Sequence, residues 1–276
     1  MRYAIVSDIH SNLQAWNAVL LDIRSTGVDR IICLGDIVGY GPNPVQVMES
    51  VHANVDHFVL GNHDAILCDK LDSSLFNDSA RFVLEWTKTQ MGKNATKFLS
   101  TLPLALDGRT FRCAHGDFSE PGYFNYVTEP QDAMPSWNAV TEQLLFVGHT
   151  HVPAIFLLGK SGTPHIVPAQ DFALEEEKRY LVNPGSVGQP RDGDARASYC
   201  IYDQEAGSVC WRRIPFDIDA YRCSVTSTGL PLSASHFLSF DPRKGVSPLR
   251  EMLSFSPPNT PELAVQNAVA IQTLEV

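Results

Sequence analysis

The first sixty residues alternate between short apolar runs and a helical pattern. Residues 2–7, 30–34 and 56–60 are apolar runs of the length typical of buried strands. Apolar residues at helical spacing separate the first two runs: Leu13, Trp16, Leu20 and Ile23. Strands that alternate with helices in this way predict an α/β fold with crossover helices.

Capping residues mark where two of these helices begin. Ser11 or Asn12 precedes the first helical pattern, and either side chain can accept a hydrogen bond from a free backbone N–H group. Asn43 and Pro44 suit the N-cap and first position of a second helix that runs to about His52.

The later chain changes from helices to strands. Residues 75–100 are predicted to be helical, and strands are predicted at 110–114, 144–147, 152–158, 163–167, 180–182, 197–203 and 207–214. From about residue 241 the chain becomes rich in Pro, Ser and Asn. We therefore expect one domain over residues 1–240 and a C-terminal extension over 241–276, with a short helix across 261–272 and no assigned role.

Composition limits the class of protein and its partners. The chain has 276 residues, of which 44% are hydrophobic and 19% charged, and its net charge is −10. Long nucleic acid is not expected as a partner, because non-specific binding depends on Lys and Arg that neutralise phosphates. A small phosphate ester held by metal ions is compatible with this charge.

Several features predict a cytoplasmic protein. An apolar strand begins at once after Met1 and leads into a polar motif at Asp8, which leaves no room for a signal peptide. No later apolar run approaches the length of a membrane span. The six cysteines contain no C-x-x-C pair and are expected to be free thiols: Cys33, Cys68, Cys113, Cys200, Cys210 and Cys223.

Residues of the types that bind metals recur where the predicted strands end. The motifs are Asp8-x-His10, Gly35-Asp36, Gly61-Asn62-His63-Asp64, His115-Gly116-Asp117 and Gly148-His149-Thr150-His151, and they hold five of the nine histidines. In α/β folds, ligands bind outside the carboxyl ends of the strands. Carboxylate, amide and imidazole groups suit divalent transition metals. The pattern predicts a site for two metal ions.

Local geometry suggests how these side chains converge. Side chains on an extended segment alternate with period two, so Asp8 and His10 should point to the same side, as should His149 and His151. Asp36 can bridge two ions with its two carboxylate oxygens.

These motifs resemble those of the calcineurin-like metallophosphoesterase superfamily, over roughly residues 1–215. The chain is most similar to small bacterial and archaeal phosphodiesterases, including members that resemble diadenosine tetraphosphatases, whose Asn-Pro-Gly-Ser-Val segment appears here at 183–187. The resemblance implies a four-layer αββα sandwich of two mixed sheets flanked by helices, with the metals at the edge where the strand ends meet.

The resemblance also implies the ligands of two divalent ions, with Mn, Fe, Zn, Ni and Co all compatible. One ion would be held by Asp8, His10, Asp36 and His151. The other would be held by Asp36, Asn62, His115 and His149. We expect in-line attack on phosphorus by a hydroxide that bridges the two ions.

His63 is our candidate for the general acid that protonates the leaving oxygen. It follows the ligand Asn62 directly, so on an extended loop it should project differently from Asn62. For Asp64 two roles stay open, a hydrogen bond that orients an imidazole or a helix N-cap. The same two roles stay open for Asp117.

Two loop residues are candidates for substrate binding. Tyr40 would either stack on a base or pack within its turn. Arg191 would either hold a phosphate bidentately or form a salt bridge with Asp192 or Asp194.

We expect a phosphoesterase that hydrolyses monoester or diester bonds of nucleotides or dinucleoside polyphosphates. A phosphoprotein phosphatase of the same fold is an alternative. A non-catalytic scaffold is a second alternative, which the intact ligand set and His63 disfavour. A DNA nuclease conflicts with the acidic balance and with the absence of a basic stripe.

Overall fold

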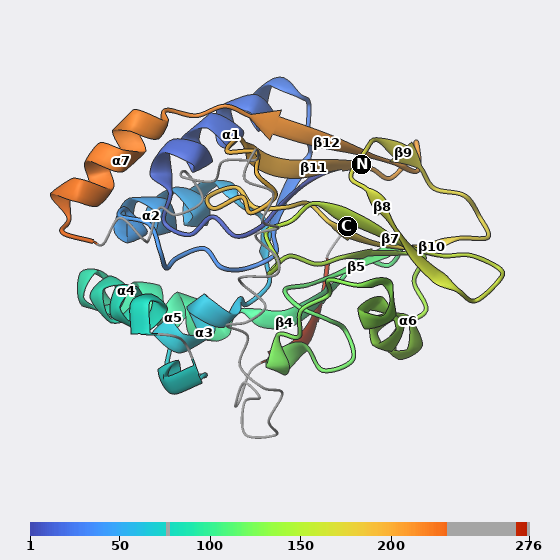
Figure 1. The fold of residues 1–276 in the computed structure, drawn as a ribbon, viewed down its shortest axis with the longest axis horizontal. Coiled ribbons are helices and arrows are strands. Elements are labelled where there is room, and N and C mark those ends of the chain that lie inside the picture. The colour runs from blue at the N-terminus through green and yellow to red at the C-terminus, as the bar shows by residue number, and fades with distance from the viewer. Residues whose placement is uncertain (76–77, 231–268, 275–276) are drawn as a thin grey trace.

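The computed structural model describes residues 1–75, 78–230 and 269–274, which form two mixed β-sheets flanked by helices (Figure 1). The first sheet has six strands in the order β3-β2-β1-β11-β12-β9. Its strands are β1 Arg2–Val6, β2 Arg30–Cys33, β3 His57–Phe58, β9 Phe172–Ala173, β11 Ala197–Asp203 and β12 Ser208–Ile214. Strands β1, β2 and β3 are parallel, whereas β11 pairs antiparallel with β1 and with β12.

The second sheet has seven strands in the order β13-β4-β5-β6-β10-β7-β8. Its strands are β4 Pro103–Asp107, β5 Phe111–Ala114, β6 Leu144–Phe146, β7 Ala154–Leu158, β8 Pro164–Pro168, β10 Arg179–Asn183 and β13 Val269–Thr273. Strands β5, β6 and β10 are parallel at its centre. Their carboxyl ends therefore meet at one edge, as do those of β1 and β2 in the first sheet.

Helices cover the outer faces of both sheets. They are α1 Leu13–Ser25, α2 Pro44–Asn54, α3 Asn62–Leu67, α4 Asp78–Gln90, α5 Lys93–Thr101, α6 Met134–Ala139 and α7 Ile218–Ser227. Three short 3-10 helices accompany them: η1 Ser73–Leu75, η2 Pro121–Tyr123 and η3 Pro130–Ala133. In Figure 1, α1, α2 and α7 lie on the side of the first sheet, and α6 lies against the second.

Alternate residues of the central strands point into different layers of the core. Tyr3 and Ile5 of β1 pack with Phe111 and Phe146 of the second sheet, which forms the interface between the sheets. Ala4 and Val6 point the other way, into the cluster beneath α1 and α2. A third cluster lies between the second sheet and α6. These three apolar interfaces require four layers, as the αββα prediction states.

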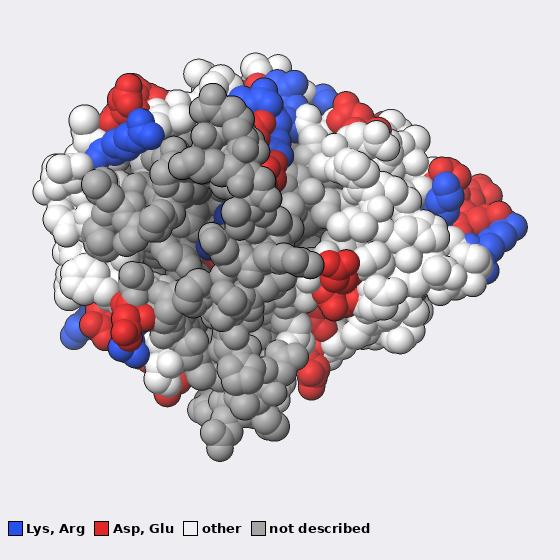
Figure 2. All heavy atoms as spheres, viewed as in Figure 1, with Lys and Arg blue, Asp and Glu red and all other residues white. Residues whose placement is uncertain are grey.

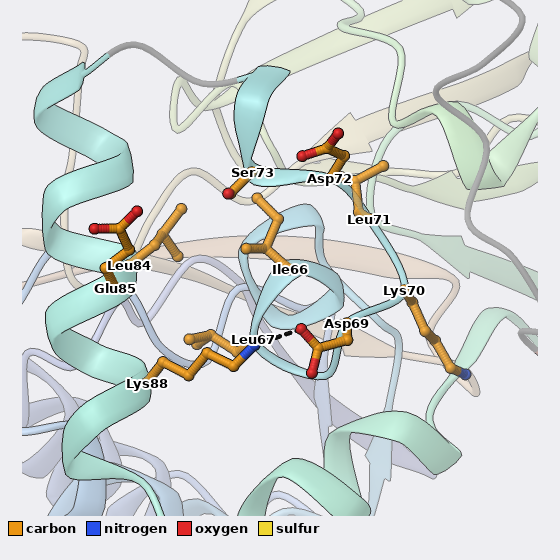
Figure 3. Close-up of a pocket in the computed structure, with 10 residues that line it drawn as sticks. All are labelled: Ile66, Leu67, Asp69, Lys70, Leu71, Asp72, Ser73, Leu84, Glu85 and Lys88. Carbon is orange, nitrogen blue, oxygen red and sulfur yellow. Dashed lines mark hydrogen bonds and ion pairs between the residues drawn. The ribbon is translucent and has the colours of Figure 1, made fainter.

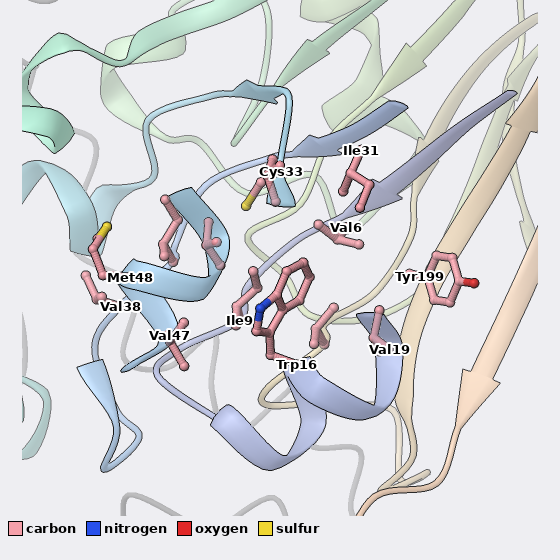
Figure 4. Close-up of a cluster of buried hydrophobic side chains, with 14 of the residues drawn as sticks. Val6, Ile9, Trp16, Val19, Ile31, Cys33, Val38, Val47, Met48 and Tyr199 are labelled. Atoms are coloured by element: carbon pink, nitrogen blue, oxygen red, sulfur yellow. The ribbon is translucent and has the colours of Figure 1, made fainter. Parts of the chain in front are cut away.

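Trp16 lies at the centre of the cluster between the first sheet and helices α1 and α2 (Figure 4). Its ring is fully buried among side chains that include Ile9 and Val19, and its indole N–H donates to Ser50 Oγ at 2.9 Å. The helical spacing predicted for α1 is thereby confirmed. Asn12 is its N-cap, because its Oδ1 accepts from the backbone N–H of Ala15 at 3.0 Å.

Several predicted elements differ from the structure. The third strand is shorter than 56–60, and α3 begins at Asn62, where an extended loop was expected. Residues 269–273 form β13, parallel to β4, and not the end of a helix, while residues 261–268 lie outside the described residues. Backbone hydrogen bonds to the edge of β4 favour the strand conformation here, and local propensity does not encode this pairing. The prediction also omitted β4, β9, α6 and α7.

The domain division at residue 240 stays a prediction. Leu274, directly after β13, is nevertheless buried in the cluster between the sheets. Within the described ranges, no helix is both long and apolar enough to cross a membrane.

Candidate metal centre

Segments that follow strands of both sheets bring the predicted ligands to one edge. Asp8 follows β1, Asp36 follows β2, and His115 follows β5. The two sheets are joined here by backbone and side-chain hydrogen bonds, such as His149 N–H to Asp8 Oδ2 at 3.2 Å. The convergence predicted from the strand ends is therefore present in the fold.

The local geometry that produces this convergence differs from the expected one. Five of the seven predicted ligands have left-handed backbone angles: Asp8 (φ 55), His10 (φ 48), Asp36 (φ 52), His149 (φ 68) and His151 (φ 61). Non-glycine residues adopt this conformation rarely, and the surrounding structure must hold it. Tight turns, and not the alternation of an extended strand, direct these side chains into the site.

The first donor group contains four buried residues: Asp8, His10, Asp36 and His151, whose ligand atoms all lie within 4.8 Å of one another. The Nε2 atom of His151 lies 3.2 Å from Asp8 Oδ1, and that of His10 lies 3.5 Å from Asp36 Oδ2. These four residues match the set implied for one ion.

The second donor group is built on Asp36, His115 and His149, which satisfy the same 4.8 Å limit. His115 Nε2 lies 3.4 Å from Asp36 Oδ2 and 3.0 Å from Asn62 Oδ1. Asn62 therefore adds an amide oxygen to this group, as expected for the second ion.

Asp36 links the two groups through one oxygen. Its Oδ1 accepts the backbone N–H of His63 at 2.9 Å, whereas Oδ2 faces both His10 and His115. The expectation that Asp36 bridges two ions with its two oxygens stays a prediction, because Oδ1 keeps a lone pair beside the hydrogen bond that it accepts. The geometry favours Oδ2 as the shared atom.

Backbone carbonyls orient three of the imidazole rings. The Nδ1 atoms of these rings face carbonyl oxygens, in the pairs His10 with Val38 at 3.1 Å, His115 with Leu34 at 2.7 Å, and His151 with Gln189 at 2.7 Å. A carbonyl only accepts, so each Nδ1 carries the hydrogen and each Nε2 presents its lone pair to the site when the ring is neutral. This arrangement is typical of histidine ligands.

The arrangement of the donor atoms favours a bound cation. His10 Nε2 and His151 Nε2 lie 3.1 Å apart, and Asp8 Oδ1 is buried without a hydrogen-bond partner in the described part of the chain. Atoms of this kind repel one another unless positive charge lies between them. Imidazole, carboxylate and amide donors together suit a divalent transition metal.

The pKa values agree with this demand for positive charge. Burial alone would raise the pKa of Asp36, but the imidazoles of His115 and His63 lower it well below its usual range. Burial would lower the pKa of His115, yet the neighbouring Asp36 raises it to about 9. Burial lowers the pKa of His10 and of His149 well below the ordinary value. These two rings are therefore neutral and can offer a nitrogen lone pair to a metal.

The His63 side chain extends from α3 and lies beside the first donor group. It is the second residue of α3, and its ring centroid lies 4.8 Å from that of His10 and 4.6 Å from that of Tyr40. Burial lowers the pKa of His63 to about 4, although Asp36 opposes this shift. The expected separation from Asn62 thus arises from helical geometry and not from an extended loop.

Among the described residues, neither Asp64 nor Asp117 orients an imidazole or is itself an N-cap, but Asp64 takes part in the capping box at the start of α3. Asp64 Oδ1 accepts from the backbone of Ile37 at 3.0 Å and Val38 at 3.3 Å, and Oδ2 accepts from Gly61 at 3.3 Å. It is the third residue of α3, while Gly61 is the N-cap. This carboxylate ties the Gly35-Asp36 turn to α3.

Asp117 stabilises the loop that follows β5. Its carboxylate accepts from Ser119 Oγ and from Asn125 Nδ2, the latter at 3.3 Å. Neither bond reaches an imidazole, so this side chain supports the backbone of residues 117–125.

Arg191 and Tyr40 lie together at the first donor group. The Arg191 guanidinium carbon lies 5.8 Å from the centroid of the Tyr40 ring, and its Nη2 donates to Gln189 Oε1 at 2.8 Å. Within residues 1–75, 78–230 and 269–274, Arg191 forms no ion pair: Asp192 pairs with Arg213 and Asp194 with Arg196. The expected salt bridges are therefore made by other arginines.

Sequence reasoning missed several residues that support the site. Tyr126 stacks on His149, with ring centroids 3.9 Å apart and planes inclined by 17°. Ser7 Oγ donates to Asp8 Oδ2 at 2.5 Å, and Asn183 Nδ2 donates to Gly148 O at 2.7 Å. No spacing in the sequence indicates Tyr126, whereas Asn183 belongs to the Asn-Pro-Gly-Ser-Val segment already noted.

A separate pocket of about 390 Å³ lies at the far end of α3 (Figure 3). It is lined by Ile66, Leu67, Asp69, Lys70, Leu71, Asp72, Ser73, Leu84, Glu85 and Lys88. Its charged groups partly neutralise one another, since Lys88 pairs with Asp69 and Lys70 Nζ donates to Ser100 O at 2.6 Å. None of the predicted site residues lines it.

Known proteins share both the sequence and the fold of this chain. An uncharacterized protein of Methanocaldococcus jannaschii is 38% identical over 232 residues, which cover 83% of this chain and 93% of the relative. A crystal structure of a metallophosphoesterase from Sphaerobacter thermophilus matches with a TM-score of 0.75 and 37% identity, over 87% of this chain and 99% of its own.

A more distant match shows the fold alone. A hypothetical protein from Pyrococcus horikoshii OT3 has a TM-score of 0.66 at 20% identity, over 84% of this chain and 95% of its own. The model of the calcineurin-like phosphoesterase superfamily domain matches residues 1–207. These matches confirm the resemblance and the two-sheet fold predicted from it: the chain belongs to the calcineurin-like phosphoesterase superfamily, and the match indicates a hydrolase that acts on phosphate esters.

Proposed function

We propose that this protein is a two-metal phosphoesterase that hydrolyses monoester or diester bonds of small substrates, such as nucleotides or dinucleoside polyphosphates. The observation that carries the proposal is the position of Asp36 Oδ2, which lies 3.5 Å from His10 Nε2 and 3.4 Å from His115 Nε2. One carboxylate oxygen thus faces two separate donor groups, as a ligand shared by two ions would.

The two donor groups support the proposed ligands. One ion would be held by Asp8, His10, Asp36 and His151, and the other by Asp36, Asn62, His115 and His149, with Mn, Fe, Zn, Ni and Co as candidates. When bound, such ions activate water for in-line attack and neutralise charge on the phosphoryl group. Asn62 contributes an uncharged oxygen, which adds no repulsion toward an anionic substrate.

His63 would donate a proton to the leaving oxygen. With a pKa of about 4, the ring is neutral at neutral pH before substrate binds. An anionic phosphate beside it favours the protonated form, so the substrate itself would charge the acid. Its position on α3, next to Asn62, keeps the ring at the side of the site formed by Tyr40 and His10.

Arg191 would bind the rest of the substrate, and Tyr40 would support Arg191. A guanidinium without an ion-pair partner among the described residues is available to a phosphate oxygen. The Tyr40 ring is packed against His10 and His63, which supports the packing role, while its contact with Arg191 would hold that guanidinium over the site.

Charge and thiol chemistry bear on partners and location. Figure 2 shows Lys and Arg in small groups beside Asp and Glu over the described part of one face, which supports a small substrate over long nucleic acid. All six cysteines are free, which supports the reducing cytoplasm predicted above.

Two other functions of the same fold remain as alternatives. A phosphoprotein phosphatase would use the same donor groups. A non-catalytic scaffold has no need of seven convergent ligand residues together with His63, so the complete set favours an enzyme.

The test is hydrolysis by metal-reconstituted protein. Protein freed of metal and reloaded in turn with Mn, Fe, Co, Ni or Zn would be assayed on bis-p-nitrophenyl phosphate, p-nitrophenyl phosphate, dinucleoside tetraphosphates and a phosphopeptide. Turnover of a small ester that an Asp36→Asn variant lacks supports the proposal. Cleavage of the phosphopeptide alone supports the phosphatase alternative, and no turnover with any metal overturns both.

A further inference from the structure

His149 differs from the other histidines of the site in what orients its ring. A backbone carbonyl fixes the rings of His10, His115 and His151 through Nδ1. Within the described residues, the His149 ring makes no such hydrogen bond. Its close neighbours are aromatic: His115, at a centroid distance of 4.9 Å, and Tyr126, at 3.9 Å.

The contact with Tyr126 has the geometry of a stacked pair. The two ring planes are inclined by only 17°, whereas the planes of His149 and His115 are inclined by 53°. A stacked partner restricts rotation of the imidazole about its side-chain bonds. When an imidazole binds a cation through one nitrogen, it becomes electron-poor, and its attraction to the electron-rich phenol face increases.

The loop that carries Tyr126 is fastened to the same motif that supplies His115. A Cβ on Gly116 would lie 2.8 Å from the backbone of Phe124, so this glycine allows the returning loop to pass close to the strand end. Phe124 adopts a left-handed φ of 55°, and Asp117 accepts a hydrogen bond from Asn125 at 3.3 Å. On the other side of Tyr126, Val127 is buried.

We propose that Tyr126 is a positioning residue for His149: its ring holds the imidazole toward the second donor group, in the place of the carbonyl hydrogen bond that His10, His115 and His151 have. This inference rests on the ligand role proposed above for His149. In the His115-Gly116-Asp117 motif, the histidine would then bind the ion directly, while the glycine and aspartate position Tyr126 to support the opposite ligand.

The test measures metal binding and needs no substrate. Metal-free wild-type protein, Tyr126→Phe and Tyr126→Leu would be titrated with Co²⁺, followed by visible absorbance and calorimetry. The Tyr126→Phe variant keeps the stacked ring and should bind two ions like the wild type. Tyr126→Leu should weaken one of the two binding steps about 10-fold and leave the other unchanged, as the loss of a residue that orients a metal ligand does.

Three outcomes would overturn the proposal. They are unchanged affinities in Tyr126→Leu, an equal weakening of both steps, and a wild-type protein that binds a single ion. Hydrolysis does not enter the readout, so wild-type protein that binds two ions without cleaving any ester would contradict the proposed function and leave this inference standing.

A measurement on the wild type guards against a variant that does not fold. In ¹H NMR spectra of the metal-free protein, the ring C–H signals of His149 should shift upfield because they lie over the Tyr126 ring. Tyr126→Phe should retain this shift. Ordinary imidazole shifts in the wild type would overturn the stacking on which the proposal depends.

Discussion

The Nε2 atoms of His10 and His151 lie 3.1 Å apart, while the Nδ1 atom of each ring faces a backbone carbonyl. Both rings therefore direct lone pairs at one point. Burial lowers the pKa of both imidazoles, which disfavours a proton between them. The fold thus creates a position that favours a cation, and residues 141 apart in sequence share it.

Removal of metal should lower the stability of the protein. A ligand that binds only the folded state adds about 2.7 kcal/mol when its concentration is 100 times its Kd. For a chain of this size that corresponds to a fall in melting temperature of about 5–10 °C on chelation. Differential scanning fluorimetry with and without a chelator measures this shift.

Asp36→Asn provides the control for the effect of chelation. Asp36 Oδ2 faces both donor groups, so its loss of charge should abolish the response of the melting temperature to Mn²⁺ or Co²⁺. A variant that is still stabilised by these ions as strongly as the wild type would contradict the shared role of Asp36.

His63→Ala should lose turnover while keeping its metal. A general acid contributes about 10²–10⁴-fold to a rate, and the backbone N–H of residue 63, which donates to Asp36, survives the substitution. Steady-state kinetics and metal analysis of the same preparation separate the two effects. If His63→Ala retained full kcat, the ring would have no part in the reaction.

Arg191→Ala should reduce kcat/KM about 10–100-fold, because a hydrogen bond to a charged group contributes about 1.5–3 kcal/mol. Arg191→Lys should recover only part of this, since an ammonium group cannot bind two phosphate oxygens in the fork geometry of a guanidinium. Metal content should stay unchanged.

Arg196→Ala is the matched control for Arg191, because Arg196 lies in the same region but already pairs with Asp194. Its kcat/KM should equal that of the wild type. Equal losses in both variants would mean that general surface charge, and not a phosphate contact, explains the effect.

Gly61→Ala should weaken metal binding at least 10-fold, in line with the cost of disturbing groups that hold a ligand. The added Cβ would lie 2.2 Å from both the backbone N and Oδ1 of Asp36 and would displace the shared ligand. Calorimetric titration with Co²⁺ measures the change.

Gly92→Ala makes the same substitution at another helix N-cap, where an added Cβ meets no atom within 4 Å. It should bind Co²⁺ like the wild type. Should Gly61→Ala bind Co²⁺ as tightly as Gly92→Ala, the close approach to Asp36 would have no bearing on the site.

Periodicity and motifs predicted much of this protein. The strands before Asp8 and Asp36 and the helix around Trp16 follow directly from local apolar patterns, since burial of those faces is encoded residue by residue. The short α3 and the edge strand β13 escaped prediction. Their backbone conformations depend on partners distant in sequence: Asp36 and Ile37 for α3, and the edge of β4 for β13.

The sequence by itself determined the chemical types of the site: which residues are carboxylates, imidazoles and amides, and that they follow strands. Only the tertiary structure decided how they are used. It assigned Asp36 Oδ1 to the His63 backbone and Oδ2 to the donor groups, left Arg191 without an ion-pair partner in the described chain, and placed Tyr126 on His149. Such roles depend on distances of a few ångströms between segments far apart in sequence, which no local pattern encodes.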